Sequence, residues 1–164
     1  MQINYKGTDK FVVKAKEATI TLESSEVDIE GLKITGPGEY ERKGIFVEGI
    51  SPNGNGPVYV VRADHITICY LGKLKNAISD DAAKQIGDID ILIVPLGEEG
   101  TIGEKEVGKV IAQIDPRIVI PMLYSDIEPF KKTEGITGEA IDSLRLKKAD
   151  LPEEDRKFYI LKDK

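Results

Sequence analysis

The side chains that could do chemistry in this sequence are few and scattered. The chain contains one histidine, His65, and one cysteine, Cys69, so two common sources of metal ligands are almost absent. A protein zinc site needs several imidazole, thiolate or carboxylate ligands held in fixed directions. His65 follows Asp64 in an expected hairpin turn, and we interpret it as a surface residue rather than a ligand or general base. Cys69 has apolar neighbours, which is typical of a small core residue.

Carboxylates near expected loops are the more abundant candidates. Two carboxylates brought close together could perform acid–base catalysis. The spacing of these residues indicates no particular pair. The sequence has no Gly-x-Ser-x-Gly nucleophile motif, and its glycines near residue 100 do not match a phosphate-binding loop. The carboxylates in question are Glu39, Glu41, Glu98, Glu99 and Asp126.

Three apolar runs, residues 68–74, 90–97 and 118–124, each end at a loop that contains glycine or proline. Continuous apolar runs are typical of strands that are covered on both faces of a sheet. We interpret the ends of these strands as the wall of a pocket. The predicted pocket residues are Lys73, Tyr70, Tyr124 and Glu39.

The first half of the chain reads as short strands separated by turns. Apolar residues alternate there with Lys and Thr, which favours strands with one buried face. Residues 51–57 carry two prolines and two glycines and predict a loop. Val58–Arg62 and Ile66–Leu71 predict a hairpin that turns at residues 63–65.

The second half alternates helices and strands. Ser79 predicts the N-cap of a helix, and the spacing of Thr101 and Glu104 matches a capping box for a helix that runs to Ile114. Leu144–Lys147 and Lys157–Leu161 predict a closing pair of strands. This order predicts a single sheet-rich α/β domain over residues 1–164, with helices on its outer faces.

Several motifs resemble the small Zn-dependent hydrolase branch of the metallo-β-lactamase superfamily. Residues 36–41, Gly-Pro-Gly-Glu-Tyr-Glu, resemble a corner of that branch, and residues 44–50 resemble the strand that follows it. Residues 147–152 resemble its C-terminal segment, and the three apolar runs resemble its pocket strands. The resemblance implies an α/β fold, the four-layer αββα sandwich, with a shortened N-terminal half.

The positions where this family carries metal ligands hold other residues. Tyr70 and Leu123 stand where the resemblance places histidines, and Lys73 stands where it places an aspartate. The family motif His-x-His-x-Asp-His should precede the Gly-Pro-Gly corner, but Leu22–Thr35 contains no histidine. Leucine has no lone pair and a protonated lysine repels a cation, so we predict that no metal cofactor is bound, although zinc would be the family cofactor.

These substitutions leave alternatives open. Lys73 either pairs its ammonium with an anion or carboxylate in the old pocket or is a solvated loop residue. Tyr70 either bonds a ligand or fills the vacated space, and we interpret Leu123 and Tyr124 as packing residues.

Composition excludes several classes of function. The net charge is −6 and the pI is about 5.0, so a nucleic-acid partner is not expected. The basic residues 145–148 read as a solvated strand edge. The sequence has no apolar run long enough to span a membrane and a single cysteine, so we expect a cytoplasmic protein without membrane contact or disulfide.

The sequence-based hypothesis is a non-catalytic relative of the hydrolases, a pseudoenzyme that acts as a binding or assembly module. Its partner would be another protein or a small anionic ligand, and a homo-oligomer remains open. The alternative is a metal-dependent hydrolase that uses ligands outside the family positions, or an inactive subunit paired with an active paralogue.

Overall fold

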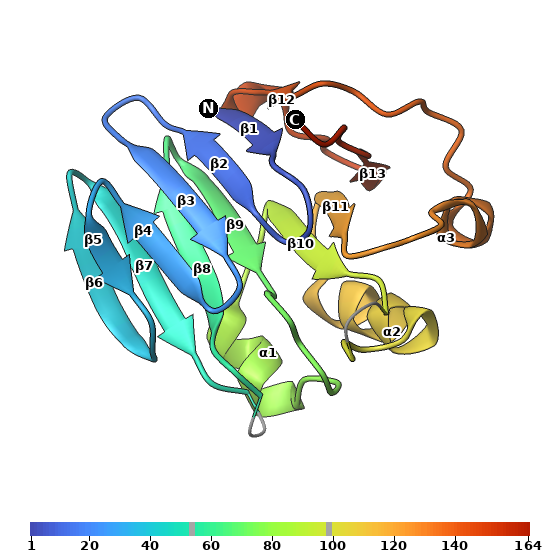
Figure 1. The fold of residues 1–164 in the computed structure, drawn as a ribbon, viewed down its shortest axis with the longest axis horizontal. Coiled ribbons are helices and arrows are strands. Elements are labelled where there is room, and N and C mark those ends of the chain that lie inside the picture. The colour runs from blue at the N-terminus through green and yellow to red at the C-terminus, as the bar shows by residue number, and fades with distance from the viewer. Residues whose placement is uncertain (53–54, 98–99) are drawn as a thin grey trace.

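The computed structural model describes residues 1–52, 55–97 and 100–164, and these residues form two facing β-sheets with helices on one side (Figure 1). The first sheet has six strands in the order β12-β1-β2-β3-β4-β5, and all its neighbouring strands are antiparallel. Its strands are β1 (Gln2–Tyr5), β2 (Phe11–Lys14), β3 (Thr19–Glu23), β4 (Glu26–Ile29), β5 (Leu32–Ile34) and β12 (Leu144–Arg145).

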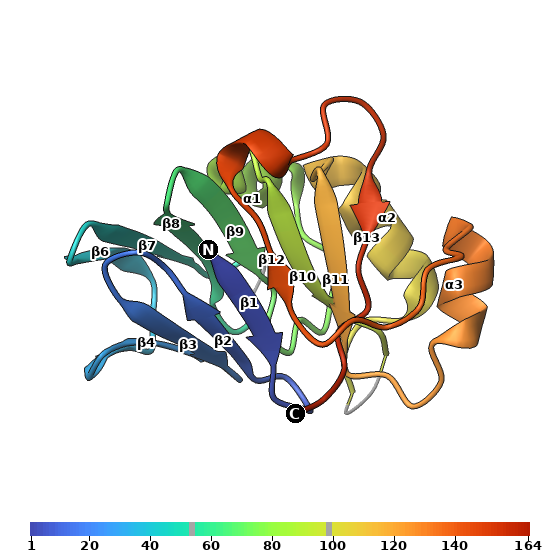
Figure 2. The ribbon, with the colours of Figure 1, turned by 90° about the horizontal axis from the view of Figure 1, so that it is seen from above.

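The second sheet has seven strands in the order β13-β11-β10-β9-β8-β7-β6. Strands β6 to β9 are antiparallel neighbours, whereas β9, β10, β11 and β13 run parallel, side by side (Figure 2). Its strands are β6 (Gly38–Arg42), β7 (Ile45–Ile50), β8 (Val58–Ala63), β9 (Ile66–Tyr70), β10 (Ile91–Pro95), β11 (Ile118–Met122) and β13 (Lys157–Phe158).

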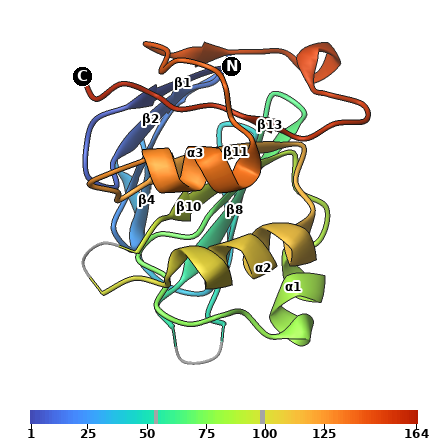
Figure 3. The same cartoon turned by 90° about the vertical axis from the view of Figure 1, so that its right-hand side faces the viewer.

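The helices α1 (Asp80–Ile86), α2 (Glu104–Ile114) and α3 (Glu128–Glu134) pack on the outer face of the seven-stranded sheet (Figure 3). A short 3-10 helix, η1 (Lys148–Asp150), follows β12. The apolar side chains of α2 fall on one stripe that faces β10, as expected for an amphipathic surface helix.

Two apolar layers hold the molecule together. One lies between the sheets and the other between the seven-stranded sheet and the helices. The central strands β10 and β11 contribute to both layers and are buried along their whole length, as the continuous apolar runs predict. Strands of the six-stranded sheet alternate buried and more exposed residues, so its outer face meets solvent.

The predicted sheet-rich α/β domain is present, with helices outside its sheets. The α-helices described above all lie on the seven-stranded sheet, so the described chain has one helical layer rather than the two of a complete αββα arrangement. The predicted hairpin is also present, with Asp64 (φ 52°) and His65 (φ 63°) at its turn. Two-residue hairpin turns of this kind require positive φ at both positions.

Two local predictions are wrong. The capping box is absent, because α2 begins after Gly103 without a side-chain cap, and the buried Thr101 hydroxyl has no hydrogen-bond partner among the described residues. The two C-terminal strands do not pair with each other, since β12 joins β1 and β13 joins β11, in different sheets. By contrast, the Ser79 cap is confirmed: its hydroxyl accepts a hydrogen bond from the Ala82 N–H at 3.2 Å.

Within the described part of the chain, no helix is long and apolar enough to cross a membrane.

Candidate functional site

The carboxyl ends of β9, β10 and β11 meet at one edge of the seven-stranded sheet (Figure 2). Hydrogen bonds extend this alignment past the strands, from the Leu71 N–H to the Ile93 carbonyl (3.1 Å) and from the Leu96 N–H to the Met122 carbonyl (2.9 Å). The loops that follow the strands are therefore held next to one another. In α/β sheets this edge is the usual place for a ligand site.

Tyr70 and Leu123 fill this edge. The Tyr70 side chain is fully buried, and its hydroxyl donates a hydrogen bond to the Asp9 carbonyl at 2.8 Å. Burial, reinforced by the negative charge of Asp9, raises the pKa of Tyr70 far above its ordinary value, so the phenol stays neutral. Leu123 is 2% exposed and adopts a positive φ of 53°. Both side chains act as packing here.

The Lys73 ammonium lies 3.9 Å from Asp9 Oδ2. The Asp9 side chain is 5% exposed and that of Lys73 is 36% exposed, so this is an ion pair between a buried carboxylate and a half-buried lysine. The Asp9 Oδ2 atom has no hydrogen-bond partner among the described residues. Of the two readings of Lys73, the geometry favours pairing with a carboxylate in the pocket.

Asp9 reaches the site from the turn between β1 and β2. That turn has positive φ at Gly7 (86°) and Thr8 (54°) and is closed by a hydrogen bond from the Lys10 N–H to the Gly7 carbonyl at 3.0 Å. Sequence reasoning did not single out Asp9, because aspartate is common in turns. The signal it lacked was the contact with Tyr70, which lies 61 residues further along the chain.

Two more tyrosines border the site. The Tyr5 hydroxyl donates to the Thr8 carbonyl at 2.7 Å, and burial together with the charges of Tyr124 and Asp163 raises the pKa of Tyr5 to about 12. Burial also raises the pKa of Tyr124. The C-terminal segment closes the other side, since a Cβ added to Gly7 would stand 2.7 Å from the Asp163 carboxylate.

The structure does not bring Glu39 to this site. Glu39 lies on β6, the outermost strand of the seven-stranded sheet, and lines a separate cavity of about 350 Å³ with Phe46 and Arg62. Asp126 is exposed and its Oδ1 caps the Glu128 N–H at 3.0 Å.

The remaining candidates from the sequence lie elsewhere or outside the described part. His65 occupies the β8–β9 turn, at the opposite end of β9 from Tyr70. Cys69 is fully buried, and desolvation raises its pKa to about 12, so its thiol is neutral. Glu98 and Glu99 lie outside the described residues.

The residues described here meet the needs of a zinc site only in small part. The Oδ2 atom of Asp9, which has no hydrogen-bond partner among the described residues, is a suitable oxygen ligand at the carboxyl ends of the parallel strands. Across residues 1–52, 55–97 and 100–164, however, no group of three or more His, Cys, Asp or Glu is arranged to hold a metal ion. Lys73 also places a positive charge beside the Asp9 carboxylate.

A sequence model described as a beta-lactamase superfamily domain matches residues 4–123. The chain belongs to this superfamily. Among curated relatives, a UPF0173 metal-dependent hydrolase of Thermococcus kodakarensis is 28% identical over 142 residues, which cover 74% of this chain and 61% of the relative. A second, from Pyrococcus furiosus, is 35% identical over 98 residues, which cover 54% of this chain and 43% of the relative. The chain spans about half the length of the curated relatives that it matches.

Solved structures share the fold. A Thermotoga maritima protein, named as a Zn-dependent hydrolase of the metallo-β-lactamase superfamily, matches with a TM-score of 0.81 at 24% identity, covering 98% of this chain and 99% of that one. Igni18, a metallo hydrolase of Ignicoccus hospitalis, matches with a TM-score of 0.66 at 11% identity, covering 89% and 99%.

These comparisons overturn three sequence-based predictions. The curated relatives are named metal-dependent hydrolases, so the prediction of a non-catalytic module, its label as a pseudoenzyme and the prediction of no cofactor are wrong. The error was to equate the replaced ligand positions and the missing histidine motif with the loss of all chemistry. The assignment of Tyr70, Lys73 and Leu123 to former ligand positions stays a prediction.

Proposed function

We propose that this protein is a metal-dependent hydrolase whose metal ligands lie outside the family positions. Membership of the superfamily and the names of its curated relatives support the reaction class. The observation that carries the proposal is the buried Oδ2 atom of Asp9, which has no hydrogen-bond partner among the described residues and lies at the carboxyl ends of the parallel strands. A buried oxygen without a hydrogen bond destabilises the folded protein unless an ion, water or ligand contacts it.

Each neighbour of Asp9 has a separate role in this proposal. Tyr70 anchors the β1–β2 turn through the Asp9 carbonyl, which fixes the direction of the carboxylate. Lys73 balances the carboxylate charge in the metal-free protein and can withdraw, because its side chain is long and 36% exposed. A bound metal would supply a water of lowered pKa for hydrolysis.

The first experiment is native mass spectrometry of tag-free protein in buffer with zinc, before and after mild chelation, followed by hydrolysis assays on ester, lactam and phosphodiester panels. We expect a mass increase that corresponds to one or two metal ions, together with metal-dependent turnover. The same spectra report the oligomeric state and any second chain that co-purifies, such as an active paralogue.

Two variants make the experiment specific to Asp9. Asp9→Asn should lose the metal, whereas Lys73→Met should retain it at least as firmly because a competing cation is gone. Asp126→Asn is the matched control, since Asp126 is exposed and its Oδ1 already accepts a hydrogen bond from the Glu128 N–H. If the Asp9→Asn variant still binds the metal, the metal ligands are other residues. If the wild type shows neither bound metal nor turnover, the proposed function itself is refuted.

A further inference from the structure

Helix α1 leaves part of the seven-stranded sheet uncovered. The helix packs Ala82 and Ile86 against the outer apolar layer, which on β7 includes Ile50. The part of the sheet that α1 covers ends near Glu48, whose Oε1 accepts a hydrogen bond from Gln85 Nε2 at 3.4 Å. Phe46 lies two residues further along the same face of β7 and is 54% exposed.

The strand register places acidic side chains around Phe46. Glu41 on β6 pairs across from Phe46, and Glu39 pairs across from Glu48. On the other side, Arg62 of β8 pairs across from Phe46, and its Nη2 atom lies 3.7 Å from Glu48 Oε2. Residues directly opposite on neighbouring strands share one face, so these five side chains form one surface, called here the Phe46 face.

The Phe46 face is hollow and carries excess negative charge. A cavity of about 350 Å³ lies over it and is lined by Glu39, Glu41, Phe46, Glu48 and Arg62. Three carboxylates face one guanidinium, and that guanidinium is already partnered by Glu48. Charged residues at the edge of a sheet discourage self-association, which accounts for the glutamates of β6 but not for an exposed phenylalanine among them.

We propose that the Phe46 face binds a basic segment of a partner protein. An arginine or lysine side chain of that segment would stack on the Phe46 ring and pair with Glu41 and Glu39. Cations are attracted to the face of an aromatic ring, and this attraction grows when nearby carboxylates share the cation. Because β6 is the outermost strand of its sheet, an extended segment could also bond to its free backbone edge. This proposal is independent of the hydrolase activity.

The test uses fluorescence anisotropy at low salt with a labelled peptide that alternates arginine and valine, and a glutamate–valine peptide as its acidic counterpart. We expect the arginine peptide to bind and the acidic peptide not to bind. Phe46→Ser should weaken binding about two- to fivefold, from the usual strength of an exposed cation–π contact. Glu41→Gln should weaken it and reduce its salt dependence, while it keeps an oxygen to accept the hydrogen bond from the Gly44 N–H.

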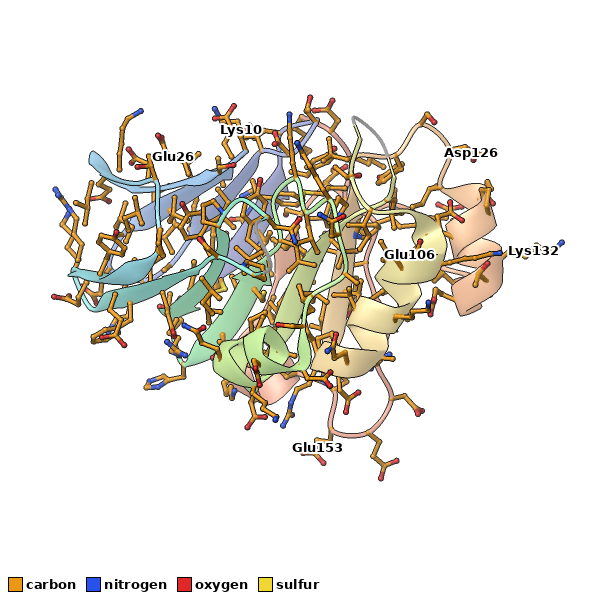
Figure 4. The ribbon with its side chains drawn as sticks, turned by 90° about the horizontal axis from the view of Figure 1, so that it is seen from below. Lys10, Glu26, Glu106, Asp126, Lys132 and Glu153 are labelled. Atoms are coloured by element: carbon orange, nitrogen blue, oxygen red, sulfur yellow. The ribbon has the colours of Figure 1, made fainter. Side chains whose placement is uncertain are left out.

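Glu153→Gln is the matched control, because it removes an exposed carboxylate on a loop far from β6 and β7 (Figure 4). It should leave peptide affinity unchanged. Equal binding of the acidic peptide, no binding of the arginine peptide, or unchanged affinity in both Phe46→Ser and Glu41→Gln would overturn the proposal. A dimer of the wild type that dissociates in Phe46→Ser, seen by sedimentation, would also overturn it, since a second copy would then occupy the face.

Discussion

Replacing Lys73 by methionine tests how the Asp9 carboxylate is tolerated in the protein interior. At 3.9 Å and an effective dielectric constant of about 20, two unit charges attract by about 4 kcal/mol. The Lys73 side chain is 36% exposed, so water screens this attraction and offsets much of it. We therefore expect Lys73→Met to lower the free energy of unfolding by about 1–2 kcal/mol, because it leaves a buried carboxylate without its counter-charge.

The assay is urea unfolding of metal-free protein at neutral pH, arranged as a double-mutant cycle with Asp9→Asn. Once Asp9 is neutral, losing Lys73 should cost much less, with a coupling energy of about 1 kcal/mol. Lys16→Met is the control: Lys16 pairs with Glu17 at 3.6 Å but is 84% exposed, so its loss should change stability by less than about 0.5 kcal/mol. Single-variant effects that add within about 0.3 kcal/mol would refute the argument that the pair stabilises the site.

Four further outcomes follow from the packing. Tyr70→Phe should lower the free energy of unfolding by about 1 kcal/mol in the same urea assay, because it removes a buried hydrogen bond. Gly49→Ala should lower the free energy of unfolding by at least about 2 kcal/mol, since its Cβ would clash with the Gly36 carbonyl oxygen, and a variant of wild-type stability would contradict the close approach of these segments. Tyr5 has its pKa raised to about 12 from 10.0, so the unfolded chain loses its proton first and stability should fall between pH 10 and 12, which unfolding at stepped alkaline pH would detect. Cys69, with its pKa raised to about 12 by burial, should react with a thiol reagent only at the rate of unfolding, and a fast reaction in native buffer would show that the strand opens locally.

Local sequence patterns were enough to predict the strands and the helix whose own residues show a clear pattern. Residues 91–94 and 118–122 are apolar without interruption, and they form the two central strands of the larger sheet. Ser79 with its following acidic residues begins a helix as predicted. The motifs that resemble the superfamily then supplied the connection of these elements into one architecture, which periodicity alone does not determine.

Pairing between distant segments could not be predicted in the same way. Leu144–Arg145 and Lys157–Phe158 both look like strands, but each joins a sheet whose other strands lie far away in sequence. The spacing of Thr101 and Glu104 is correct for a capping box, yet the chain buries the Thr101 hydroxyl without a partner among the described residues and starts the helix after Gly103. Tertiary packing overrides such local preferences whenever burial contributes more free energy than a cap, which is worth about 1 kcal/mol.

The candidate site depends on the same kind of long-range contact. Tyr70 and Lys73 were named from the sequence as a substituted histidine and a substituted aspartate, and both proved to contact one residue that no pattern singled out. Asp9 is polar, sits in a glycine-containing turn and has every local feature of a solvated residue, but the turn folds over the ends of the parallel strands and leaves the Asp9 side chain only 5% exposed. A ligand set is defined by which oxygens converge in space, and residues far apart in sequence can supply them. Replacement of the residues at the family's ligand positions therefore removes one set of metal ligands, but it does not decide whether the fold holds a metal with a different set. We expect Asp9 to be one ligand of that different set.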